Sequence, residues 1–116
     1  MKRIFHNKLV RDRIPDIVRE NGGTPFSHEI RDDDVYHEEL ALKLIEEAKE
    51  VLEAQQKRNR ESLLTEIADV QEVLGALMSA YGIGPSEVEM VRVKRNVQRG
   101  GFSKRILLEF VEEGKA

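Results

Sequence analysis

Residues 35–57 read VYHEELALKLIEEAKEVLEAQQK, and residues 62–81 read SLLTEIADVQEVLGALMSAY. In both stretches apolar side chains recur every three or four residues, which is the spacing of one face of an α-helix. Aspartates at 32–34 supply a cap and negative charge for the start of the first helix. The connection between the stretches is short, so we expect them to pack as antiparallel neighbours. The sequence therefore predicts a helical hairpin.

Weaker signals surround this hairpin. Residues 12–21 are expected to form a short helix, with Asp12 as its N-cap and Pro15 in its first turn. Residues 86–98 are expected to form a third long helix, which Ser86 and Glu89 open as a capping box. Residues 26–30 fit a short strand or a loop, and the apolar tail at 106–111 fits a strand or a final helical turn. Together these signals predict an all-α fold, an antiparallel bundle of three to four main helices with room for a short β segment.

The composition limits the chemistry. The chain has 116 residues, enough for a single domain spanning 1–116 but short for two cores. It has no cysteine, which excludes a disulfide scaffold, cysteine-bound zinc, an iron–sulfur cluster and a cysteine nucleophile. No apolar run reaches the ~20 residues of a membrane span, and residues 1–15 lack the apolar core of a secretory signal. We therefore expect a cytoplasmic protein whose chemistry uses oxygen and nitrogen ligands.

The acidic residues of the first long helix can converge. Glu46, Glu47 and Glu50 form the pattern E-E-x-x-E, which spans an arc of ~100° on a helix. A solvated acidic face is the commoner explanation of this pattern, because most Glu-rich helices carry one. The motif alone therefore leaves both interpretations open.

The acids of the second helix favour a cation. Glu66 lies within the apolar stripe that includes Val70, and Asp69 is flanked by Val73. Carboxylates in such positions are rarely buried unless they are paired or bound to metal. A buried salt bridge to Lys or Arg, or burial against another subunit, would also explain acids at these positions. The two helices together nevertheless offer four to five carboxylates, an oxygen-only set that suits Mg²⁺ or Mn²⁺.

Two groups of basic residues could hold a polyanion such as a chain of phosphates. One group lies near the N-terminus and the other late in the chain, and a solvated basic face remains the alternative for both. The candidates are Lys8, Arg11, Lys94, Arg95 and Arg99.

These motifs resemble those of a known superfamily. The pattern Glu46-Glu47-x-x-Glu50 followed by Glu66-x-x-Asp69 is similar to the signature of the MazG-like, all-α NTP pyrophosphohydrolases. This superfamily also contains dimeric dUTPases and phosphoribosyl-ATP pyrophosphohydrolase. The stretches HNKLVRDRIP at 6–15 and KRNVQRGGF at 94–102 resemble its branch of predicted house-cleaning pyrophosphatases for non-standard nucleotides.

The resemblance implies a reaction and a set of site residues. It implies Mg²⁺-dependent hydrolysis of a nucleoside triphosphate to NMP and pyrophosphate, in which a metal-activated water attacks phosphorus. The implied metal ligands are Glu47, Glu50, Glu66 and Asp69. Glu46 and Glu47 are the implied catalytic acids, and Glu46 would bind a second ion or act as the base. Phosphoribosyl-ATP as substrate is one alternative, and a non-catalytic helical binding module is the other.

The apolar surface of the predicted hairpin also suggests self-association. Its two helices are apolar over wide arcs, and Ala68, Ala76 and Ala80 add a second, small-residue surface. We therefore expect a homodimer or homotetramer. A net charge of −3 and few aromatic residues speak against a stable nucleic-acid partner.

Overall fold

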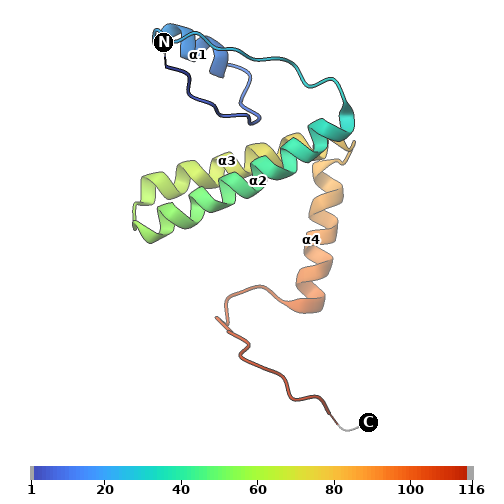
Figure 1. The fold of residues 1–116 in the computed structure, drawn as a ribbon. Helices are drawn as coiled ribbons and strands as arrows, with labels where there is room; N and C mark the ends of the chain where they lie inside the picture. The colour runs from blue at the N-terminus through green and yellow to red at the C-terminus, as the bar shows by residue number, and fades with distance from the viewer. Residues whose placement is uncertain (1, 115–116) are drawn as a thin grey trace. The chain divides into compact units, whose positions relative to one another are not determined.

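The computed structural model describes residues 2–114, which contain four α-helices and no strand (Figure 1). The helices are α1 (Ile14–Glu20), α2 (Asp33–Gln56), α3 (Arg60–Ala80) and α4 (Pro85–Arg99). The all-α prediction is confirmed. The short β segment considered at 26–30 is not formed, and the tail at 106–111 forms neither the strand nor the helical turn that we expected.

Helices α2 and α3 pack side by side as the predicted antiparallel hairpin (Figure 1). Each helix is capped by the residue before it. The side chain of Asp32 accepts a hydrogen bond from the Val35 N–H at 3.0 Å, and that of Asn59 accepts one from the Ser62 N–H at 3.1 Å. These caps place both helix starts two residues earlier than the apolar pattern alone suggested.

The seam between α2 and α3 is narrow. The buried residues of the described chain are Leu40, Glu47, Ala54 and Val73, so an acid occupies the middle of the apolar seam. Other apolar residues at the helical spacing of these two stretches, among them Ile45 and Leu52, are exposed. The hairpin therefore buries one line of side chains and leaves a second apolar face uncovered.

The starts of α1 and α4 also differ from the prediction. The N-cap of α1 is Arg13 rather than Asp12, because a turn in which the Ile14 N–H bonds the Arg11 carbonyl delays the helix. Helix α4 begins at Pro85, whose preset φ and missing N–H suit the first helical position. Gly84 is consequently the N-cap, and the Glu87 carboxylate accepts its N–H at 2.8 Å. The predicted capping box was therefore wrong, since it placed Ser86 at the cap.

The chain divides into two compact units, one ending at Gly82 and one beginning at Ile83. The first contains α1, α2 and α3, and the second contains α4 and the tail that follows it. Within the second unit the apolar side chains of α4 and of residues 106–111 are exposed. The assignment of 1–116 to one domain stays a prediction. None of the helices formed by residues 2–114 has the length and apolar character needed to cross a membrane.

Candidate metal centre

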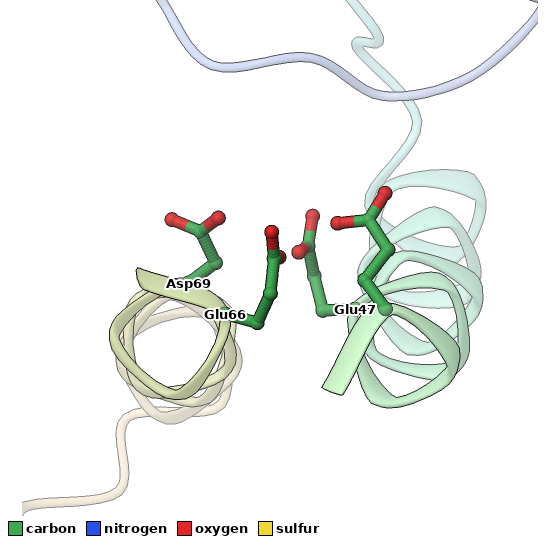
Figure 2. A group of neighbouring side chains, drawn as sticks. Glu47, Glu66 and Asp69 are labelled. Carbon is green, nitrogen blue, oxygen red and sulfur yellow. The ribbon is translucent and has the colours of Figure 1, made fainter. Parts of the chain in front are cut away.

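Four carboxylates meet between α2 and α3. Glu47 and Glu50 come from α2, and Glu66 and Asp69 come from α3. Each can offer one oxygen to a set in which all the oxygens lie within 4.8 Å of one another. Within each pair the acids are three residues apart, so they share a helix face, and the antiparallel packing brings the two faces together. Figure 2 shows Glu47, Glu66 and Asp69 extending from the two helices toward the same side of the hairpin. We call these four residues the acidic cluster.

The acidic cluster contains oxygens that lack a partner. Glu47 is only 7% exposed, and its Oε2 has no hydrogen-bond partner within the described residues. The Oε2 atom of Glu66 is also buried without a partner. A buried carboxylate oxygen left in this state destabilises the fold unless a cation or a donor satisfies it. These two atoms are the observation that separates the cluster from an ordinary acidic surface.

Burial and mutual repulsion change the acidity of the cluster. Burial raises the pKa of the Glu47 carboxyl, and the neighbouring Glu50 carboxyl raises it further. Burial also raises the pKa of Glu50, with Glu66 adding to the effect. Both shifts arise because a low-dielectric, negatively charged environment disfavours another negative charge. A bound divalent cation would offset the repulsion between these carboxylates and would favour their ionised forms. The oxygen-only donor set fits Mg²⁺ or Mn²⁺.

The N-terminal segment lies against the acids through two ion pairs. The Lys8 ammonium donates to Glu46 Oε1 at 2.7 Å, and the Arg11 guanidinium donates to Asp69 Oδ1 at 2.7 Å. The salt bridge considered for the second acid pair is therefore present at Asp69, while Glu66 has no ion pair among the described residues. The two N-terminal residues predicted to bind phosphate are thus located at the acidic cluster and beside it.

Glu46 has an environment different from that of the cluster. It is not among the four acids that share the oxygen set. Lys8 bonds one of its oxygens, and Lys43 donates to the other, Oε2, at 3.1 Å. The hydrogen bond from Lys8 lowers the pKa of the Glu46 carboxyl. Its role as a base or as a ligand for a second ion stays a prediction.

The sequence interpretation overlooked Lys43. Its ammonium also lies 3.7 Å from Glu47 Oε1, and its side chain is largely buried. The signal was present in the sequence, because Lys43 precedes Glu46 and Glu47 by three and four residues on one helix. The other predicted phosphate ligands, Lys94, Arg95 and Arg99, are exposed on α4 in the second unit. Their role also stays a prediction.

Comparison with protein families gives a match over most of the chain. Residues 7–96 match the family described as phosphoribosyl-ATP pyrophosphohydrolase. The matched region includes the acidic cluster, Lys8 and Arg11. No curated protein and no solved structure matches the chain.

Proposed function

The chain belongs to the phosphoribosyl-ATP pyrophosphohydrolase family, and we propose that it is a Mg²⁺-dependent enzyme that hydrolyses a nucleoside triphosphate to NMP and pyrophosphate. The proposed substrates are non-standard or surplus nucleotides, which gives the protein a house-cleaning role. The observation that carries the proposal is the acidic cluster with its unpartnered Glu47 and Glu66 oxygens.

The acidic cluster supplies what phosphoanhydride hydrolysis requires. Glu47, Glu50, Glu66 and Asp69 would hold Mg²⁺, with Mn²⁺ as a substitute. The ion would supply charge neutralisation for the phosphates and would lower the pKa of a bound water. In this reaction the oxygen of water forms a bond to phosphorus, and the bond between that phosphorus and the pyrophosphate leaving group breaks. A carboxylate accepts the proton that the water loses.

Of the two predicted catalytic acids, Glu46 lies outside the four-acid oxygen set, whereas Glu47 would be held by the metal. Glu46 would therefore bind a second ion or accept the proton of the water. The hydrogen bond from Lys8 lowers the pKa of the Glu46 carboxyl, which keeps it ionised for either role.

Several basic side chains are candidates for binding the phosphates. Lys8, Lys43 and Arg11 lie in the first unit at the acids. Arg95 and Arg99 of the second unit are proposed to contribute as well, and replacing either with Ala should raise KM without removing the metal. Unchanged kinetics in both variants would make this stretch a solvated basic face.

Phosphoribosyl-ATP is the second candidate substrate, and the family match itself favours it. The bond to be cleaved and the metal chemistry are the same, so the acidic cluster serves either substrate. Only the groups that contact the base and the sugars would differ.

Pyrophosphate release distinguishes these possibilities. The protein is assayed with Mg²⁺ against standard NTPs, modified NTPs and phosphoribosyl-ATP, and each assay is repeated with EDTA. Glu50→Gln should abolish release, whereas Glu72→Gln, which changes an exposed acid of α3 outside the cluster, should not. Turnover of phosphoribosyl-ATP alone would select the second candidate. Absence of metal-dependent release from every triphosphate would refute the enzymatic function and leave a binding module.

We also propose that the protein works as a homodimer or homotetramer. The exposed apolar face of the α2–α3 hairpin supports this proposal. No stable complex with nucleic acid is expected.

A further inference from the structure

We propose that residues 7–12 act as a tethered counter-ion, in which Arg11 occupies Asp69 until a divalent cation takes this carboxylate and frees the guanidinium for the substrate phosphates. The inference rests on the proposed function, because it assumes that the acidic cluster binds metal. In this proposal the N-terminal segment makes metal binding precede the binding of the substrate phosphates, a role that the family match alone does not state.

Arg11 is bonded to a member of the acidic cluster. Its guanidinium lies 2.7 Å from Asp69 Oδ1, and Asp69 is one of the four acids whose oxygens converge. A guanidinium and a divalent cation repel each other and seek the same carboxylate, so they compete for Asp69. Among residues 2–114, the other ion pair to the cluster is the longer contact of 3.7 Å between Lys43 and Glu47. Arg11 is therefore the main side chain that competes with the metal for the acidic cluster.

The Arg11–Asp69 pair can open at small cost. The side chains of Arg11 and Asp69 are 56% and 30% exposed. Ion pairs with this much solvent contact contribute little to stability. A divalent cation bound by four carboxylates can displace such a partner. The freed guanidinium can then offer its fork of donors to phosphate oxygens.

Lys8 has the complementary role of an anchor. It bonds Glu46, which lies outside the cluster, and Lys43 holds the other oxygen of that carboxylate. Metal binding at the cluster therefore leaves this contact in place. Asn7, immediately before Lys8, adopts a positive φ of 47°, which turns the chain as it meets α2. The segment is thus held at Lys8 while Arg11, three residues further on, is free to exchange partners.

Space is available beside the anchor. A cavity of about 130 Å³ lies between the segment and α2, and its lining includes Asn7, Lys8, Leu42 and Lys43. Two ammonium groups and the carboxylates of Glu39 and Glu46 therefore border one small cavity. Figure 2 shows the N-terminal segment, in pale blue, passing on the side to which the labelled carboxylates point.

Metal binding without nucleotide provides the first test. Isothermal titration with Mn²⁺ alone should show that Arg11→Gln binds the ion about two- to fivefold more tightly than the wild type, because the competing cation is gone. With Mn²⁺ present, the same variant should bind α,β-methylene-ATP several-fold more weakly. The two effects have opposite signs, which a general loosening of the site would not produce.

Arg19→Gln is the matched control. It removes an exposed arginine whose ion pair with Asp16, at 2.8 Å, lies within α1, so both affinities should stay at the wild-type values. Limited trypsin digestion of the wild type gives an independent readout. Cleavage after Arg11 should accelerate with Mn²⁺ alone and slow again when the analogue is added.

The outcomes separate the two proposals. Unchanged or weaker Mn²⁺ binding by Arg11→Gln, in a protein whose wild type does bind Mn²⁺, overturns the counter-ion role and leaves the proposed function intact. Failure of the wild type to bind Mn²⁺ at all overturns the metal site, and the counter-ion role with it.

Discussion

At the scale of single residues, the centre of the α2–α3 seam is a carboxylate in an apolar position. A fold stabilised by packing alone would place a Leu or Val at position 47, as it does at Leu40 and Val73. Glu47 instead retains an unpartnered buried oxygen, next to other acids that also repel its charge. The buried charge of Glu47 therefore lowers the stability of the fold at the place where the proposed chemistry needs negative charge.

This cost leads to a prediction for Glu50→Gln. Removing one charge from the acidic cluster should raise the melting temperature of the metal-free protein at neutral pH, by about 4–8 °C for each kcal/mol of repulsion relieved. The same variant should lose the rise in melting temperature that millimolar Mg²⁺ produces in the wild type. Glu53→Gln, an exposed change one turn away on α2, is the control and should leave both values unchanged. A variant that keeps the Mg²⁺ response would remove Glu50 from the metal site.

The raised pKa values of Glu47 and Glu50 predict how metal stabilisation depends on pH. In the metal-free protein these two carboxyls contribute stability that is full below their unfolded pKa and is lost as the pH rises through the higher folded pKa. Bound metal needs the ionised forms, so protons compete with it in the same range. The difference in melting temperature between Mg²⁺ and EDTA should therefore shrink as the pH falls from about 8 to about 5.

Glu46 does not obscure this measurement. Its pKa is lowered, so the stability it contributes persists until the pH falls below the ordinary range of a glutamate. A Mg²⁺ effect that stays constant from about pH 8 to about pH 5 would contradict the assignment of Glu47 and Glu50 as ligands.

At the scale of secondary-structure elements, local signals were sufficient for most of the fold. The apolar period and the caps predicted α2 and α3 to within two residues at their starts, since helix formation depends on neighbours in the chain. The convergence of Glu47, Glu50, Glu66 and Asp69 followed from their spacing and from the antiparallel packing. The error at α4 came from giving Ser86 more weight than Pro85, although proline is the stronger start signal there.

The remaining features could not be predicted because they depend on contacts between distant segments. Residues 7–12 have no periodicity, so nothing local paired Lys8 with Glu46 or Arg11 with Asp69. The exposure of Ile45 and Leu52 also depends on what else covers the hairpin, which a helical pattern does not specify.

The Asn59 cap gives a prediction at this scale. Its side chain satisfies the Ser62 N–H in the tight connection that begins α3, after Arg58 has turned the chain with a φ of 54°. Asn59→Ala should lower the free energy of unfolding by about 0.5–2 kcal/mol, as measured by urea denaturation. Asn59→Asp, which can still accept this bond, should lose much less. Equal losses in the two variants would show that the capping bond is not the cause.

At the scale of the whole molecule, the hairpin has two different sides. Ile45 precedes Glu47 by two residues and Ile67 precedes Asp69 by two, so each isoleucine lies about 200° around its helix from an acid of the cluster. The side of the hairpin away from the acidic cluster forms an apolar face. Its exposed side chains include Ile45, Leu52, Leu64, Ile67 and Leu74, which are 41–61% exposed. This apolar face is built from bulkier residues than the predicted alanine surface, of which Ala76 and Ala80 are already half-buried.

The last prediction is that a second hairpin covers this face. Exposed apolar faces of this extent mark interaction sites, and pairing two hairpins into a four-helix bundle would bury both copies at once. Because the face points away from the acidic cluster, the pairing would leave the cluster open to substrate. Light scattering at micromolar concentration should therefore give a mass of at least twice the 13.3 kDa chain. The double variant Ile67→Glu/Leu74→Glu should be monomeric and less stable, whereas Glu72→Gln on the same helix should assemble like the wild type. A wild-type mass of 13.3 kDa with full activity would refute the oligomer.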